Sequence, residues 1–414
     1  MPIRIPLLTG ILIVAALTPM RADEPLPIPN RIEGPQKPVP PDYFGMHIHR
    51  ALTTTPWPTV HFKELRLWDA GVTWTFLEPH KGEWHFDSLD RLVGKASDHG
   101  ASVLLTFGRT PPWASALSGN GVDPKKSETI PAKSMDDWRD FVRKVATRYK
   151  GKISAYEVWN EPNLAQFYGG DVPTLVAMTK EAAQIIHSID PAALVVSPSP
   201  TGPQGLEFLR QFLSAGGGQY VDVIGYHLYV TPDPPEEIAG LAAAVKSIVA
   251  QHHLNLPIWD TETGWSKPKY FSSNEEASAW LARGMLLAWV SGIDRFYWYA
   301  WDNRGWCTLT LTNDDESPNP NAYAYSTLQN WMTGKQVENC SRQKDHTWVC
   351  SLKDGASESY IFWNPDKKVG FTPPQTADGN TGWRLRELGG KSSGAKPGEI
   401  FADQQPRLLQ PAGR

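Results

Sequence analysis

Short apolar stretches alternate with amphipathic segments along most of the chain. Eight stretches of strand length recur, at 43–50, 64–68, 101–108, 153–160, 193–200, 221–230, 256–265 and 294–302. Segments with helical periodicity lie between them, at 88–100, 134–151, 174–190, 236–253 and 274–292. Strands that alternate with helices imply parallel β-α-β units, and eight strands close a (β/α)8 barrel. The pattern therefore predicts an α/β protein built on a (β/α)8 TIM barrel.

The pattern changes at about Gly334, after which short strand-like runs are separated by turn signals and no helical periodicity is seen. This change predicts a small C-terminal all-β domain packed beside the barrel. We accordingly expect four segments: a signal peptide at 1–22, a proline-rich leader at 23–41, the barrel at 42–334 and the β domain at 335–414.

The N-terminal segment has the form of a secretory signal peptide. Arg4 precedes a mostly apolar run from Ile5 to Leu17, and small residues lead to a plausible cleavage point after Ala22. A membrane anchor is the alternative, but the run is short for a span, and no other stretch is long and apolar enough to cross a bilayer. We expect a secreted or periplasmic protein with no membrane span after cleavage.

Composition narrows the classes of function. The 40 basic residues nearly balance the 44 acidic ones, which gives no electrostatic case for nucleic acid. The 18 tryptophans are either barrel core or platforms for sugars, whose C–H faces suit indole rings. Of the three cysteines, Cys340 and Cys350 are expected to bridge a hairpin, with Cys307 left over. Their spacing does not indicate zinc, and we expect no cofactor.

Catalytic groups of such barrels lie at the carboxyl ends of the strands. Polar and aromatic residues gather at these ends here. They are His47 and His49 on the first strand, Arg66 on the second, Asn160 and Glu161 on the fourth, His227 and Tyr229 on the sixth, Glu262 on the seventh, and Tyr299 and Trp301 on the eighth.

Glu161 and Glu262 end strands that face each other across a barrel. Two carboxylates across a cleft are the equipment of glycoside hydrolysis, in which one protonates the departing oxygen and the other attacks the anomeric carbon or activates water. Asn160 is suited to hydrogen-bond a sugar hydroxyl, Tyr229 to donate to Glu262, and Trp301 to form a platform under the sugar. The sequence therefore predicts a glycosidase that acts on a β-linked glycan.

One geometric question stays open. Strict alternation along a strand places Asn160 and Glu161 on opposite faces, whereas the predicted chemistry needs both at the mouth of the barrel. A break in the pleat before Pro162 resolves the conflict.

The stretches "WNEPN" at 159–163 and "TETG" at 261–264 resemble the motifs of the clan A glycoside hydrolases, and the chain is most similar to family 39 and related secreted bacterial glycosidases. The resemblance implies a (β/α)8 enzyme that retains anomeric configuration, with Glu161 as acid/base and Glu262 as nucleophile. It also implies sugar-binding or supporting roles for Asn160, His227, Tyr229 and Arg66. The strand-8 aromatic is left open between Trp298, Tyr299 and Trp301.

Two alternatives remain. His47 and His49 form a His-x-His at the end of the first strand, similar to the metal site of amidohydrolase barrels, where His227 and Asp302 would be further ligands. In the glycosidase interpretation His49 instead lines the sugar cleft. The other alternative is a non-catalytic glycan-binding barrel, which the fold alone does not exclude.

Overall fold

A computed structural model of the chain describes residues 26–412 except 118, 120–121, 266–270, 303–307, 375–381 and 397. The expected signal peptide at 1–22 and Cys307 therefore lie outside the described residues. Eight parallel strands form the barrel, and each falls within a predicted stretch. They are β2 (Phe44–Met46), β3 (Glu64–Leu67), β4 (Ser102–Phe107), β5 (Ala155–Val158), β6 (Leu194–Val196), β7 (Ile224–Tyr226), β8 (Ile258–Thr263) and β9 (Arg295–Trp298). The predicted fold class is confirmed.

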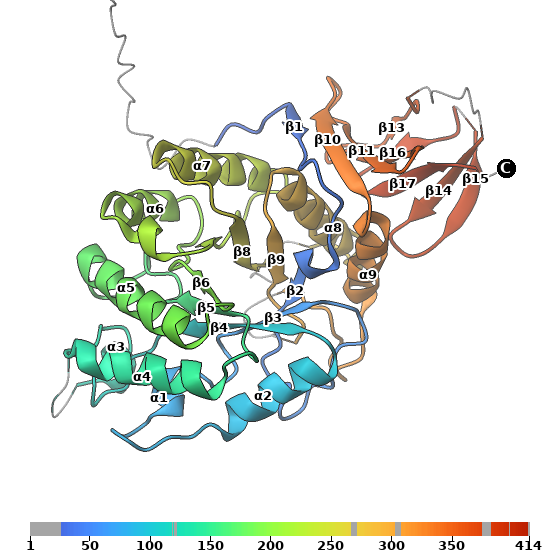
Figure 1. Cartoon of the computed structure of the whole chain (residues 1–414). Coiled ribbons are helices and arrows are strands. Elements are labelled where there is room, and N and C mark those ends of the chain that lie inside the picture. Colours follow the sequence, from blue (N-terminus) through green and yellow to red (C-terminus); the bar gives the residue numbers. More distant parts are fainter. Residues whose placement is uncertain are drawn as a thin grey trace, which may run out of the picture.

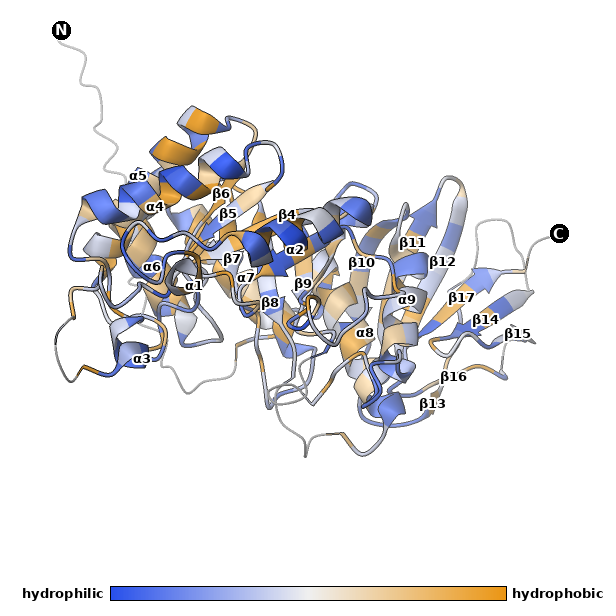
Figure 2. Ribbon diagram, turned by 90° about the horizontal axis from the view of Figure 1, so that it is seen from below, coloured by the Kyte–Doolittle hydropathy of each residue, from blue (hydrophilic) through white to orange (hydrophobic). Residues whose placement is uncertain are grey.

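The strands follow the order β6-β5-β4-β3-β2-β9-β8-β7, so neighbours in sequence are mostly neighbours in space. The two edge strands meet through a parallel bridge between Val196 and Val223, which brings the sheet close to a complete cylinder. Helices cover the outside of the strands (Figure 1). In Figure 2 the strands are largely orange, whereas the helices carry blue, hydrophilic residues on their outer sides.

All five predicted helices are present, as α2 (Asp87–Asp98), α4 (Met135–Arg148), α5 (Val172–Ile189), α7 (Glu237–Gln251) and α8 (Asn274–Val290). Ser134 caps α4 through its side chain, as its place before the apolar periodicity suggests. The structure adds two longer helices that the sequence pattern did not reveal, α6 (Gly205–Ser214) and α9 (Pro320–Met332), and two one-turn helices, α1 (Trp74–Leu77) and α3 (Pro124–Ser127). Helix α6 lies between turn residues at Gly202–Pro203 and Gly216. These turn signals on both sides hide the helical spacing of its apolar residues in the sequence.

The interior of the barrel is layered. An apolar cluster separate from the main core is formed by Leu104, Ala155, Val196, Val223, Trp259 and Tyr297. Two residues further along three of these strands, the same face carries Thr106, Glu157 and Thr261, all with 0% exposure. The barrel is therefore packed with apolar side chains at depth and with polar ones directly beneath its mouth.

The C-terminal domain is a seven-stranded antiparallel sheet in the order β1-β10-β11-β12-β17-β14-β15, with a small pair β13 and β16. Its strands are β10 (Gln336–Arg342), β11 (Trp348–Asp354), β12 (Ser357–Trp363), β13 (Val369–Gly370), β14 (Trp383–Glu387), β15 (Ser392–Ala395), β16 (Phe401–Ala402) and β17 (Arg407–Pro411). Cys340 and Cys350 face each other in the β10–β11 register and form a disulfide with their Cα atoms 4.0 Å apart.

The proline-rich leader contributes to this sheet. Its strand β1 (Arg31–Glu33) pairs with β10, placing Ile32 opposite Cys340, so the leader lies along the edge of the C-terminal sheet (Figure 1). A one-turn 3-10 helix at Pro41–Tyr43 then leads into β2. No helix within the described residues is long and apolar enough to cross a membrane.

A buried polar contact joins the β domain to the barrel. Glu236, at the start of α7, accepts hydrogen bonds from Trp363 Nε1 on β12 (2.8 Å) and from Arg283 Nη1 on α8 (3.2 Å). The Glu236 and Arg283 side chains are only 5% and 2% exposed. Arg283 contacts Glu236, whereas Glu276 and Asp366 act on it from further away, so this buried cation depends strongly on Glu236.

We therefore predict that Glu236→Ala lowers the free energy of unfolding by about 3–5 kcal/mol, because Arg283 is left buried without its counter-charge. Chemical denaturation of the parent and the variant measures this difference. The matched control is Glu207→Ala, which removes an exposed carboxylate paired with Arg210 and is expected to change stability by less than about 1 kcal/mol. Equal effects of the two variants would contradict the assigned role of Glu236.

Candidate active site

A cavity of about 620 Å³ opens at the carboxyl ends of the barrel strands. This volume is typical of small-molecule sites, which span roughly 300–1,000 Å³. Segments following seven of the eight strands, together with Glu262 on β8, contribute to its wall, which is lined by His49, Arg50, Trp68, Asp69, Arg109, Asn160, Glu161, Leu164, Gln166, Phe167, Thr201, Gln204, Tyr229, Thr231, Glu262, Tyr299 and Asp302. Six of the ten residues that the sequence places at the strand ends thus border the same cavity: Asn160, Glu161, Tyr229, Glu262, Tyr299 and His49.

The backbone after β5 leaves the regular pleat. Trp159 has φ 83° and Glu161 has φ 42°, both in the left-handed region that L residues rarely adopt. Glu161 N–H donates to the carbonyl of Ser199 (2.9 Å), which ties the distorted turn to the segment after β6. This local break lets Asn160 and Glu161 both line the cavity, which answers the question that strand alternation left open. Such conformations cost about 1–3 kcal/mol and concentrate at functional sites.

Both oxygens of Glu262 accept hydrogen bonds from buried or half-buried groups. Tyr229 Oη donates to Oε1 (3.0 Å) and Arg66 Nη1 donates to Oε2 (2.7 Å). Burial and the charge of Glu161 raise the pKa of Glu262 above its ordinary value, although the charges of His227 and Arg66 act in the opposite direction. Two donors aimed at one carboxylate favour its charged form and fix its orientation.

Glu161 has a different environment. Its Oε1 lies 3.0 Å from Nδ1 of His227, whose side chain is fully buried on the segment after β7. Burial lowers the pKa of His227, but the negative charges of Glu262 and Glu161 outweigh this, and the pKa is raised above its ordinary value. His227 is therefore a supporting group beneath the acids and does not line the cavity, and the same holds for the buried Arg66, which also donates to Asn160 Oδ1 (2.7 Å).

The structure distinguishes the strand-8 aromatics. Trp298 and Trp301 belong to the hydrophobic core and are at most 2% exposed, whereas Tyr299 lines the cavity and donates to Asp69 Oδ2 (2.8 Å). Tyr299, and not Trp301, thus occupies the wall position that the sequence assigned to a sugar platform.

The ring of His49, in the wall of the cavity, lies between the carboxylates of Asp302 and Asp69. Its Nδ1 lies 3.3 Å from Asp302 Oδ1, and its ring packs edge-on against Tyr299. Burial raises the pKa of Asp302, but hydrogen bonds from His49, Thr55 and the Arg50 backbone bring it down to about 2. Asp302 is therefore a fixed anion at this end of the cavity.

Several wall residues were not predicted. Trp68 and Asp69 directly follow the second strand, so the rule that located Glu262 could have found them. Arg109 stacks on Trp68 with its guanidinium carbon 5.1 Å from the ring centre, and Phe167 meets Trp68 edge-on. Arg109, Phe167 and Gln204 lie in loops whose course the sequence pattern does not define.

A metal site does not fit this arrangement. Within the described ranges, one group of three potential ligands converges, Glu161, His227 and Glu262, with one ligand atom of each within 4.8 Å of the others. Glu262 already neutralises Arg66, and a cation there would face that guanidinium. His47 belongs to no such group: its Nε2 lies 3.0 Å from the carbonyl oxygen of Thr261, and burial with the charge of Arg66 holds its pKa well below the usual range. The His-x-His metal interpretation is therefore not supported.

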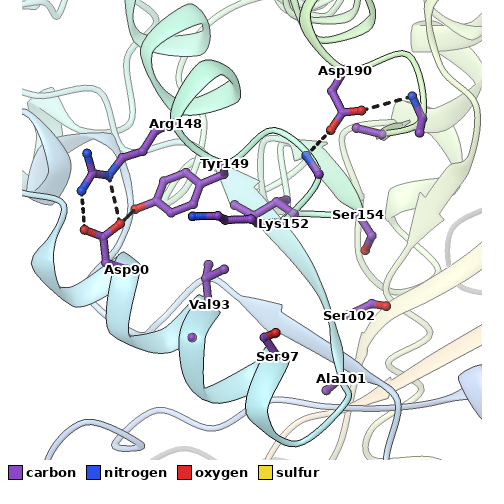
Figure 3. A pocket seen from close by; sticks show the side chains of 15 residues that line it. Asp90, Val93, Ser97, Ala101, Ser102, Arg148, Tyr149, Lys152, Ser154 and Asp190 are labelled. Atoms are coloured by element: carbon purple, nitrogen blue, oxygen red, sulfur yellow. Dashed lines mark hydrogen bonds and ion pairs between the residues drawn. The ribbon is translucent and has the colours of Figure 1, made fainter.

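A second cavity of about 820 Å³ lies at the opposite end of the barrel (Figure 3). Three of its charged groups are engaged with one another or with the backbone: Arg148 and Tyr149 contact Asp90, and Asp190 accepts from the N–H of Gly151. Ser102 and Ser154 line it from the amino ends of β4 and β5. No pair of facing carboxylates converges there, so this cavity lacks the chemistry of the other one.

Two convergent acids at the mouth of a (β/α)8 barrel define the class of the glycoside hydrolases. Residues 117–325 match the family model "Glycosyl hydrolase catalytic core". This match spans half of the chain, and the chain belongs to that family. The resemblance seen in the motifs is thereby confirmed at the level of family and fold.

One curated relative is similar to the chain in sequence, and two solved structures are similar to it in fold. The chain is 24% identical over 245 residues to a β-xylosidase from Geobacillus stearothermophilus, an alignment that covers 52% of the chain but only about half, 48%, of that relative. A family 39 β-xylosidase from Caulobacter crescentus has a similar fold, with a TM-score of 0.58 and 16% identity over 92% of the chain and 98% of that structure. A conserved exported protein from Bacteroides fragilis has a TM-score of 0.66 and 12% identity over 92% of the chain and 99% of that structure.

The hydrogen bond from Tyr229 to Glu262 gives a direct prediction. Hydrogen bonds to charged groups contribute about 1.5–3 kcal/mol, so Tyr229→Phe is expected to lower kcat/KM for an aryl β-glycoside about ten- to a hundred-fold. Because a donor to the ionised form is lost, the pKa of Glu262 rises and the acid limb of the pH profile moves to higher pH.

Tyr299→Phe is the matched control, since it removes a hydroxyl from the same cavity that contacts Asp69 rather than Glu262. We expect a smaller loss and a smaller shift of the acid limb, because this hydroxyl reaches Glu262 through Asp69 and not by direct contact. If both variants behave alike, Tyr229 does not act through Glu262.

Proposed function

We propose that the chain is a retaining β-glycosidase in which Glu262 is the nucleophile and Glu161 the acid/base. The observation that carries this proposal is the approach of a carboxylate oxygen of each to within 4.8 Å. Retaining enzymes hold their carboxyl groups about 5–5.5 Å apart, whereas inverting ones need room for a water molecule and separate them by roughly 6.5–9.5 Å.

The surroundings of the acids support this division of roles. A nucleophile must be ionised and aimed, and Glu262 receives a charged and a neutral donor on its two oxygens. An acid/base must exchange a proton with the leaving oxygen, and Glu161 has the imidazole of His227 as its neighbour, with no arginine bound to it in the described contacts. Attack by Glu262 breaks the glycosidic bond as the Glu161 proton passes to the leaving group.

Xylan and its oligosaccharides are the substrate class that we propose. The related protein from Geobacillus stearothermophilus is a β-xylosidase, and the chain is 34% identical over 88 residues to endo-1,4-β-xylanase 2 from Claviceps purpurea. A shallow depression of about 480 Å³ adjoins the cavity, and Gln204 lines both. It begins at Pro162 and Asn163, directly after Glu161, and offers space for further sugar residues on the leaving-group side.

We also infer that the protein is exported. The support is the signal-like N-terminal sequence, the Cys340–Cys350 disulfide, which persists in oxidising compartments, and the exported bacterial protein of similar fold.

Azide rescue tests the roles of the two acids. Glu161→Ala is expected to form the glycosyl-enzyme from an activated aryl β-glycoside, whose leaving group needs no proton, and then to stall because nothing deprotonates water. Azide can attack the intermediate from the vacated space, restoring turnover and giving a β-glycosyl azide. Glu262→Ala is expected to show no such rescue on the same substrate.

The product is identified by NMR of the anomeric centre. Rescue of Glu262→Ala to a β product, with Glu161→Ala inert, would reverse the assignment. Parental rates in both variants would disprove the proposed function.

A panel of polysaccharides with product sizing tests the substrate class. We expect release of reducing sugar from β-1,4-xylan or xylo-oligosaccharides and none from α-linked glucans, because only a β-linked leaving group meets the proton of Glu161 on the face opposite Glu262. Glu262→Ala protein, prepared in the same way, is the control for contaminating activity. Hydrolysis of other β-glycans without any action on xylan would refute the substrate and leave the mechanism in place.

A further inference from the structure

A third carboxylate, Glu157, lies beneath the two acids of the site. It is on β5, four residues before Glu161, and its side chain is 0% exposed. Glu157 shares the inward face of β5 with Ala155, so it points into the barrel and not towards the covering helices. It lines neither of the two large cavities described above, and the mechanism above does not use it.

The carboxylate of Glu157 accepts four hydrogen bonds from residues that the structure describes. Arg66 donates to Oε2 through Nε (2.8 Å) and Nη2 (2.5 Å), and Thr106 Oγ1 donates to the same oxygen (2.6 Å). Ser199 Oγ donates to Oε1 (2.5 Å). Burial raises the pKa of Glu157, but Arg66, His227 and the two hydroxyls together bring it below its ordinary value. Glu157 is therefore a buried anion.

One guanidinium thus links Glu157 to the reaction centre. Arg66 contacts Glu157 through Nε and Nη2, Asn160 through Nη2, and Glu262 through Nη1. The Arg66 side chain is 0% exposed, so water does not screen this charge. The charge of Arg66 is consequently divided between Glu157 and Glu262.

We propose that Glu157 is a positioning residue for the reaction, which holds Arg66 in place and sets how much of its positive charge reaches Glu262. This inference rests on the proposed function, in which Glu262 is the nucleophile.

The balance of charge through the reaction explains why a second carboxylate is needed. When Glu262 attacks the anomeric carbon, a C–O bond forms, the glycosidic bond breaks, and the Glu161 proton goes to the leaving oxygen. Glu262 then becomes a neutral ester and no longer balances Arg66. A buried cation without a partner is strongly unfavourable. Glu157 keeps Arg66 paired while the intermediate exists.

Other charged groups also act on Glu262, and a pH effect must be separated from them. Arg66 and Asp69 lie on β3 and its loop, Glu161 on the loop after β5, and His227 on the segment after β7, where the neutral Tyr229 donates a hydrogen bond to Glu262. Among these, Arg66 is the one that Glu157 touches, so a change at Glu157 reaches Glu262 chiefly through the guanidinium.

Glu157→Gln tests the proposal, because it keeps the shape of the side chain and removes its charge. The full charge of Arg66 then falls on Glu262, which becomes more acidic and a weaker nucleophile. We expect the acid limb of the kcat/KM profile for an aryl β-glycoside to move down by about one pH unit. We also expect kcat/KM at the optimum to fall about ten- to a hundred-fold, because formation of the intermediate leaves Arg66 unpaired.

Glu157→Asp is the conservative comparison. It retains the charge, so its acid limb is expected near that of the parent even if shortening the side chain lowers kcat/KM. A purely structural Glu157 would lower the melting temperature in both variants without moving the limb of either, and that result overturns the proposal. Ser102→Ala, in the cavity at the opposite end of the barrel, controls for nonspecific effects.

If Glu157→Gln does not fold, Thr106→Val supplies the test. This variant removes the hydroxyl that donates to Glu157, while Glu157 stays negatively charged. The carboxylate of Glu157 then offsets more of the positive charge of Arg66, and less of that charge acts on Glu262. The acid limb is then expected to move up by about half a pH unit, the opposite sign. An unmoved limb in this variant likewise rejects the proposal. Failure of the proposed function itself is distinct, since the parent enzyme would then hydrolyse no β-glycoside or azide rescue would assign the nucleophile to Glu161.

Discussion

The guanidinium of Arg66 lies inside the barrel without access to water, and its charge must be matched by buried carboxylates. Glu157 and Glu262 supply that match at 2.5–2.8 Å, and Asn160 takes a further N–H. The planar guanidinium of Arg66, on β3, therefore links β5 and β8 by hydrogen bonds at the mouth of the barrel. Since unpaired buried charge costs several kcal/mol, the positions of Glu262 and Asn160 are set by the same interaction that makes the polar layer stable.

The apolar layer beneath gives this arrangement its rigidity. The six side chains of that layer fill the barrel, so the polar side chains above them cannot move deeper into it. The covering helices and the β domain, joined to them through Glu236, close the outside. Each of the two acids is 7% exposed, so it borders the cavity and is also held in place by the residues around it.

The distorted backbone after β5 also determines the geometry of the site. The left-handed conformations of Trp159 and Glu161 turn two consecutive residues towards one cavity, which a regular strand does not permit. The cost is tolerable because the turn is anchored on both sides: Trp159 Nε1 donates to the carbonyl of Phe167 (2.8 Å), and Glu161 N–H to that of Ser199. The loop that carries the acid is thus fixed by the fold around it before any ligand is bound.

The sequence by itself determined the strand number, the barrel and the two acids, because alternation and strand ends are local properties that a folded chain keeps. It also predicted the β10–β11 hairpin and its cysteines. Only the tertiary structure decided which side chains meet across the barrel. The contact of Arg66 with Glu157 joins positions 91 residues apart, the leader strand β1 pairs with β10, and Tyr299 instead of Trp301 faces the cavity. These outcomes depend on how strands close and how loops depart from the pleat, and periodicity along the chain carries no information about either.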